Sequence, residues 1–171
     1  DDDVVRRRNV HFAAVVNGVV DNTALVDGLP QTISYTAGTD LDLLYARTAQ
    51  DITRESNGTT VAFTFDHLLS KAVFTFTNTS HDKEDNLYVV ENIQISGLGK
   101  TATYDVTDGW GASSYDNTYV VDFGNIVEAA TPTGAPAVAV SNEARQSNYE
   151  RLLIPGTHTI KITCTISLYL N

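Results

Sequence analysis

The chain has 171 residues, 42% of them hydrophobic, which is enough for one ordinary domain to bury a core without disulfides or metals. Its formal charge of -10, from 11 basic against 21 acidic residues, is repelled by phosphate backbones and anionic membrane faces, so we expect no nucleic-acid partner. The single cysteine, Cys164, excludes an internal disulfide framework and a multi-cysteine zinc site.

The N-terminal residues 1–9, DDDVVRRRN, are expected to form a flexible tail, because they are highly charged and lack the apolar stretch of a signal peptide. The chain also lacks a run of about 18 apolar residues, which a transmembrane helix would need. We therefore expect any targeting segment to have been removed or to lie outside this sequence.

Apolar and polar residues alternate with a period of two along most of the chain, which predicts strands with one buried and one wet face. In chain order, the apolar members are Val10, Phe12, Ala14 and Val16; Val61, Phe63 and Phe65; Phe74 and Phe76; Leu87, Val89, Ile93 and Ile95; Tyr119, Val121 and Phe123; and Ile160, Ile162, Cys164, Ile166 and Leu168. The last set predicts a long, half-buried strand in which Cys164 is a small buried hydrophobe.

Turn-forming pairs such as Asn17-Gly18 and Asp27-Gly28 separate these segments, and only residues 66–71 and 142–149 could hold a helical turn or two. Half-wet antiparallel strands must bury their apolar faces against each other. The sequence therefore predicts an all-β fold over residues 1–171, a single antiparallel two-sheet β-sandwich with Greek-key connections and very little helix. Residues 128–141 are expected to form a long surface loop, either partner-facing or a tolerated insertion.

Residues that could carry chemistry form no catalytic or metal-binding pattern. The histidines are scattered without the spacing of ligands, so we predict no metal site and no cofactor; they are His11, His67, His81 and His158. Nucleophile elbows, phosphate-binding glycine loops and dinucleotide motifs are missing as well. The run HDKEDN, residues 81–86, offers clustered oxygen ligands without the spacing of a calcium loop. The sequence therefore favours a protein that is not an enzyme.

Two aromatic residues, Trp110 and Tyr115, lie in the polar, glycine-rich segment DGWGASSYDN. An exposed aromatic ring there could stack on a sugar ring or on a partner protein, so both are candidate ligand-binding residues. In the alternative interpretation, Trp110 closes one end of the sandwich.

Two stretches together resemble the fimbrillin-like (type V pilin) surface proteins of Bacteroidota. The first is LDLLYARTAQ followed by TTVAFTFDHLLSKAVFTFTN, in which DLLYA is residues 42–46 and an F-x-H-x-L-S-K-like strand pair is residues 65–71. The second is YERLLIPGTHTIKITCTI, residues 149–166, which is similar to the LLIP segment of the family. The two occur in the order of the family, and both encode strands rather than catalytic residues.

The resemblance implies transthyretin-like sandwiches in a lipoprotein that is exported to the outer membrane and built into an extracellular fimbrium. It also implies assembly with other pilin subunits by protease-triggered donor-strand exchange, in which a strand of the next subunit fills a groove left by a removed strand. The tribasic run Arg6-Arg7-Arg8 is then a possible processing site, and otherwise a solvated tail. Since members of the family usually extend further at both ends, the resemblance leads us to expect a short or processed form, or a fragment of a longer two-domain pilin.

The leading hypothesis is a structural subunit or tip adhesin of a cell-surface pilus, which assembles by strand exchange and mediates adhesion. The alternative is a monomeric surface lipoprotein that binds host glycan or protein through Trp110, Tyr115 and the loop at residues 128–141. A groove along a sheet edge favours the first hypothesis, and fully paired edges favour the second.

Overall fold

The computed structural model describes residues 10–170 except 24, 39, 49–51, 54–55, 78, 80–85 and 127–144. This part of the chain contains no α-helix, and residues 66–71 hold short strands instead of a helical turn. The strands are β1 (Ala13–Val16), β2 (Val19–Val20), β3 (Leu25–Val26), β4 (Leu29–Pro30), β5 (Thr32–Thr36), β6 (Leu44–Arg47), β7 (Asp66–His67), β8 (Ser70–Ala72), β9 (Thr75–Phe76), β10 (Asn86–Ser96), β11 (Gly99–Asp105), β12 (Gly109–Trp110), β13 (Ser114–Tyr115), β14 (Val120–Gly124), β15 (Arg145–Gln146), β16 (Arg151–Leu153) and β17 (Lys161–Leu170). The predicted all-β class is confirmed.

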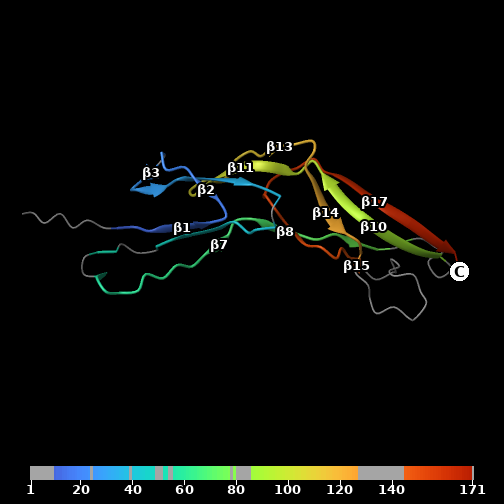
Figure 1. Cartoon of the computed structure of the whole chain (residues 1–171), viewed down its shortest axis with the longest axis horizontal. Coiled ribbons are helices and arrows are strands. Elements are labelled where there is room, and N and C mark those ends of the chain that lie inside the picture. The colour runs from blue at the N-terminus through green and yellow to red at the C-terminus, as the bar shows by residue number, and fades with distance from the viewer. Residues whose placement is uncertain are drawn as a thin grey trace, which may run out of the picture.

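All the described strand pairs are antiparallel. The larger sheets have the orders β1-β6-β7, β14-β10-β17 and β12-β11-β5-β2, with β13 also on β11, and the two-stranded ones are β15-β9, β16-β8 and β3-β4. The molecule is elongated, with β1, β2 and β3 toward one end and β10, β17 and the C-terminus toward the other (Figure 1). The two-sheet sandwich with Greek-key connections stays a prediction.

Buried apolar side chains form two clusters. The first includes Ile33 and Leu43, and the second includes Ile93 and Phe123; all four side chains are 0% exposed. Tyr119 packs against both clusters and so links them. The second cluster lies against the sheet formed by β14, β10 and β17, which is the sheet that matters for the candidate site.

Four of the segments predicted to be strands from their alternation are paired strands in the structure. The alternation at residues 10–16, 87–95, 119–123 and 160–168 corresponds to β1, β10, β14 and β17. Residues 61–65 form no ladder, since the pairing of β6 on the side away from β1 is limited to Asp66 and His67. The ring centroids of Phe63 and Phe65 lie 6.3 Å apart. The pattern analysis missed β5 and β11, which pair with each other in the largest sheet.

Candidate functional site

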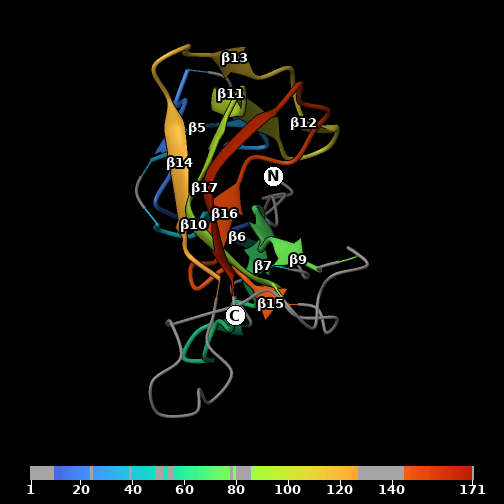
Figure 2. The same ribbon diagram turned by 90° about the vertical axis from the view of Figure 1, so that its right-hand side faces the viewer.

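β17 is a ten-residue edge strand near the C-terminal end of the chain. It contains no proline and is rich in β-branched residues, so its backbone can enter a ladder along its whole length. It pairs with β10 from Lys161 to Leu170, and within the described residues it has no ladder partner on its other side. Figure 2 shows β17 and β14 alongside β10 in this sheet.

The apolar side chains of β17 lie on the core face of this sheet. Residues directly opposite one another in antiparallel strands carry their side chains on the same face. Ile162 is opposite Ile95, and Ile166 is opposite Val90. Ile95 and Val90 are 2% and 4% exposed, whereas Ile162 and Ile166 are 45% and 62% exposed. The face of the sheet that is buried at β10 therefore extends onto β17, where no other segment covers it to the same extent.

The cover over β10 and β14 comes from the segments that contain β8, β9 and β16. Phe74, between β8 and β9, packs edge-to-face on the buried Phe123 with 4.8 Å between the ring centroids. Ala72, Phe76 and Leu153 also pack on this cluster. We call the exposed set along β17 and just before it the open strip; it consists of Ile160, Ile162, Ile166 and Leu168, which are 45%, 45%, 62% and 50% exposed. Among the described side chains of the strand, only Cys164 packs partly into the cluster.

Two local features fix β17 beside β10. The register shifts in the middle of β10, where Asn92 has a φ of 53° and its backbone N–H donates to Oδ1 of Asn125 at 3.0 Å. The amide group of Asn92 also donates to Oγ1 of Thr165 at 3.4 Å. At the end of the strand, Gly97 has a φ of 81°, and a Cβ there would overlap the carbonyl oxygen of Thr159. A bulge and a glycine thus set the twist and close approach of the two strands.

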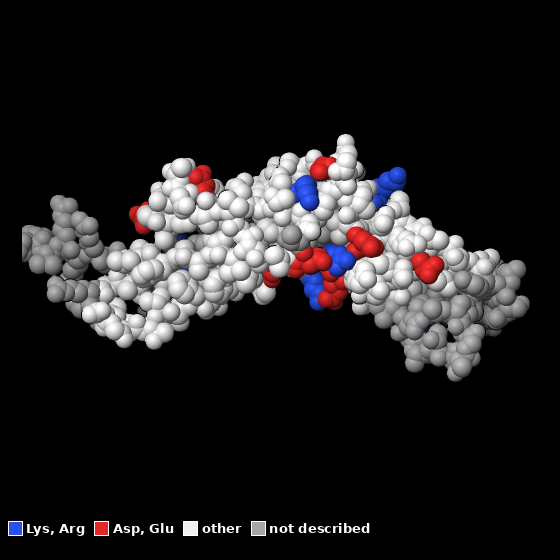
Figure 3. Space-filling model, viewed as in Figure 1, with Lys and Arg blue, Asp and Glu red and all other residues white. Residues whose placement is uncertain are grey.

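On the face shown in Figure 3, charged side chains gather mainly near the middle of the molecule. β17 itself carries a single charged residue, Lys161. The described ion pairs join the segments before β6 and around β7, β8 and β16; they are Asp40–Arg151 at 3.3 Å, Lys71–Glu150 and Asp42–His67. Ion pairs with an exposed partner contribute at most about 1 kcal/mol each to the free energy of unfolding, so they add little to stability.

The two candidate ligand-binding aromatics have different surroundings. Trp110 is half-buried, donates its indole N–H to the carbonyl of Leu68 at 2.8 Å and packs edge-to-face on Tyr104 at 5.4 Å. Tyr115 is 52% exposed, and its hydroxyl donates to the carbonyl of Thr157 at 3.2 Å. Their predicted role in binding a glycan or protein stays a prediction, and Tyr115 presents the more accessible ring.

Titratable groups with shifted pKa values lie outside the open strip. Burial raises the pKa of the Tyr35, Tyr45 and Tyr119 phenols, and hydrogen bonds from Thr118 lower the pKa of the exposed Asp116 carboxyl. In the described part of the chain, no group of three or more His, Cys, Asp or Glu side chains could hold a metal ion. The described residues also contain no helix that is long and apolar enough to cross a membrane.

Several sequence predictions fall outside the described residues. These are the possible processing site at Arg6, Arg7 and Arg8, the proposed surface loop at residues 128–141, and residues 81–85 of the HDKEDN run.

The exposure of the open strip was not predicted from the sequence, which assigned the same residues to a half-buried strand. Their alternation identifies the face correctly, since Ile162 and Ile166 lie opposite buried residues. One feature of the sequence could have indicated that a partner covers β17. Exposed edge strands usually carry lysines or prolines that prevent pairing with other chains, whereas β17 has one lysine and no proline.

The chain belongs to the fimbrillin-like family, whose family model matches residues 5–170. This confirms the resemblance seen in the sequence and places the chain among structural surface proteins of cell-surface fimbriae, a family that is not enzymatic.

A comparison with solved structures finds a fimbrial protein from Bacteroides vulgatus ATCC 8482, at a TM-score of 0.61 and 22% sequence identity. The match covers 91% of this chain and 60% of that protein, so the chain spans less than two thirds of its length. At this identity the likeness concerns the fold alone. A comparison with curated proteins gives no match.

Proposed function

We propose that the chain is a structural subunit of a cell-surface fimbria, and that a strand from a neighbouring subunit covers its open strip. The observation that carries this proposal is the exposure of Ile162 and Ile166 on the face where their partners Ile95 and Val90 are buried. Fimbrillin-like family membership supports the subunit role.

A strand added at β17 would gain two kinds of contact. Its main chain would hydrogen-bond to the edge of β17, and alternate apolar side chains would pack on the open strip. Fully burying an isoleucine or leucine contributes about 1.5–3 kcal/mol, so covering four half-exposed side chains contributes about 3–6 kcal/mol before the cost of ordering. That is enough to drive association once backbone hydrogen bonds are added.

We further propose that the sheets are the layers of a transthyretin-like sandwich and that the neighbouring strand supplies the missing cover over β17. Export as an outer-membrane lipoprotein and proteolysis at Arg6, Arg7 and Arg8 precede assembly. Replacing these three arginines by alanine is expected to stop maturation; normal maturation would remove the processing step and leave the role of the strip intact.

The direct test compares Ile166→Lys with Thr163→Lys in cells that assemble the fimbria. Ile166 belongs to the open strip, whereas Thr163 lies on the opposite face of the same strand. Lysine at position 166 would place a charge in the covered contact, so we expect loss of fimbriae by electron microscopy and in the sedimented surface fraction.

Thr163→Lys is expected to assemble normally. Because Ile166 is 62% exposed in the single chain, its substitution should change the free energy of unfolding by less than about 1 kcal/mol. Normal assembly of a folded Ile166→Lys protein would refute the proposal.

A second candidate function is adhesion through residues 108–117. Tyr115 supports it, because its ring is 52% exposed and held in place by the hydroxyl bond to Thr157 and by an edge-to-face contact with His158 at 6.0 Å. An exposed, fixed ring can stack on a sugar or on a partner side chain. A tip adhesin would use both this surface and the open strip.

A further inference from the structure

Two asparagine–glycine pairs lie in connecting segments of this chain, Asn17-Gly18 and Asn57-Gly58. An asparagine that precedes a glycine is prone to deamidation, because glycine has no side chain to hinder the approach of its backbone nitrogen to the asparagine side chain. That nitrogen must come within bonding distance of the side-chain carbonyl carbon, which requires rotation of the main chain between the two residues. The surroundings of each pair therefore decide whether it can react in the folded protein.

The Asn57 pair lies in an exposed turn. In the described part of the chain, no group hydrogen-bonds to the Asn57 side chain or to the Gly58 N–H. Gly58 has a φ of 82°, and a Cβ placed on it would meet no other part of the chain within 4 Å. The turn is closed by two bonds from Thr59 to the carbonyl of Ser56, at 3.0 Å from the N–H and 2.6 Å from the hydroxyl. Since water replaces exposed hydrogen bonds at little net cost, the Gly58 nitrogen can reach the Asn57 side chain.

The Asn17 pair, in contrast, is held in place by the core. The side-chain amide of Asn17 donates to the carbonyl of Asp42 at 2.7 Å. A Cβ on Gly18 would lie 2.6 Å from Ile33 and 2.7 Å from Leu43, and both of these side chains are 0% exposed. Because a closely packed core leaves no room for such movement, Gly18 can approach the Asn17 side chain only if the first buried cluster opens.

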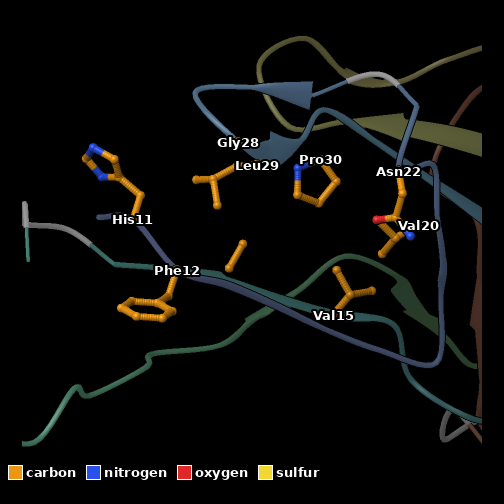
Figure 4. Close-up of a pocket in the computed structure, with 9 residues that line it drawn as sticks. His11, Phe12, Val15, Val20, Asn22, Gly28, Leu29 and Pro30 are labelled. Atoms are coloured by element: carbon orange, nitrogen blue, oxygen red, sulfur yellow. The ribbon is translucent and has the colours of Figure 1, made fainter. Parts of the chain in front are cut away.

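Two aspartate–glycine pairs could form the same cyclic intermediate. Gly28 of the Asp27-Gly28 pair lies in the turn between β3 and β4, beside a pocket that also borders β1 (Figure 4). The second pair is Asp108-Gly109, at the start of β12. A carboxylate is a poorer electrophile than an amide, and its reaction by this route leaves the charge of the chain unchanged. The amide of Asn57 is therefore the group whose reaction alters the protein most.

We propose that Asn57 is a site of spontaneous deamidation in the folded protein, with water as the co-reactant. The Gly58 nitrogen forms a bond to Cγ of Asn57, the C–N bond of the side-chain amide breaks, and the proton of the Gly58 nitrogen leaves with the amide as ammonia. Water then opens the cyclic imide at either of its carbonyl carbons. The products are aspartate, which keeps the original main chain, and isoaspartate, in which the main chain runs through the former side chain; nothing is oxidised or reduced.

The reaction changes the surface of the protein beside β1. Asn57 and Gly58 border a pocket of about 490 Å³, whose described lining includes Val10 and Phe12 and contains no charged side chain. Either product places a carboxylate there and makes the chain one unit more negative than its formal charge of -10. Isoaspartate also lengthens the main chain within the turn, so the two hydrogen bonds that close the turn lose their geometry.

The test follows both asparagines in one sample of the folded full chain, which is incubated at neutral pH and digested into peptides for mass spectrometry. Position 57 is expected to gain the mass of amide-to-acid conversion at least about tenfold faster than position 17, because reaction at Asn17 requires local opening of the core. The intact chain should become more acidic in ion-exchange chromatography at the same rate. Asn57→Gln should abolish this change without altering the unfolding midpoint, because glutamine must close a larger ring that forms less readily.

The same measurement in urea supplies the control. Both positions are expected to react at similar rates once the fold is lost, since they share the same dipeptide. Equal rates at positions 57 and 17 in the folded protein would overturn the inference, because the fold would then not select Asn57. An amide at position 57 that persists in the folded chain, while both positions react in urea, would overturn it as well. Assembly of the fimbria does not enter this experiment, so either result leaves the proposed function standing.

Discussion

β10 and β17 are neighbours in one sheet, yet they differ in what lies over them. Ile95 and Ile162 stand directly opposite each other on the same face, and they are 2% and 45% exposed. Phe74, Phe76 and Leu153 pack on the cluster that contains Ile95, whereas Cys164 is the one described β17 side chain that reaches this cluster. The parity of a residue decides which face it occupies, but the neighbouring layer decides whether that face is buried.

The largest expected effect comes from truncating each member of this pair in the isolated chain. Ile95→Ala should lower the free energy of unfolding by about 3–4 kcal/mol, because it leaves a cavity in a closed cluster. Ile162→Ala should cost only about 1 kcal/mol, because its site is open to water. Urea unfolding of both variants measures the difference, and equal losses would show that the strip is covered in the single chain.

A smaller contrast is expected between the two aromatic residues of the segment 108–117. Trp110→Ala should lower stability by about 3 kcal/mol, since the indole packs on Tyr104 and hydrogen-bonds to Leu68. Tyr115→Ala should change it by less than about 1 kcal/mol while weakening adhesion of assembled fimbriae to a glycan-coated surface. Unchanged adhesion with a folded Tyr115→Ala protein would remove Tyr115 from the proposed contact.

The smallest expected effect is the pH dependence of stability that arises from two tyrosines in the core, Tyr35 and Tyr119. Burial raises the pKa of Tyr35 and Tyr119 above the ordinary value of 10.0, so folding favours the protonated phenols. Their contribution to stability is fully present below about pH 10 and is lost as the pH rises through the raised pKa. Unfolding midpoints measured across this range should fall less steeply for Tyr119→Phe than for the unsubstituted chain, and parallel curves would contradict this.

Much of the fold could be predicted from the sequence, because alternation reports strand faces. The pattern from Ile160 to Leu168 predicted β17 and its core face correctly. The same kind of pattern at Val61, Phe63 and Phe65 was wrong as a ladder strand, since hydrogen-bond partners are a property of the whole fold. The openness of β17 could not be predicted either, because it depends on where the covering segments end.

The most direct test of the central claim is amide hydrogen exchange along β17, compared between the single chain and assembled fimbriae. In an edge strand, alternate N–H groups point to the paired side and to the free side. We predict that the free-side amides of residues 161–170 exchange fast in the single chain and at least about a hundredfold more slowly in the fimbria, because a neighbouring strand then accepts their hydrogen bonds. An exchange pattern that is the same in both states would contradict the proposal that assembly adds a strand to β17.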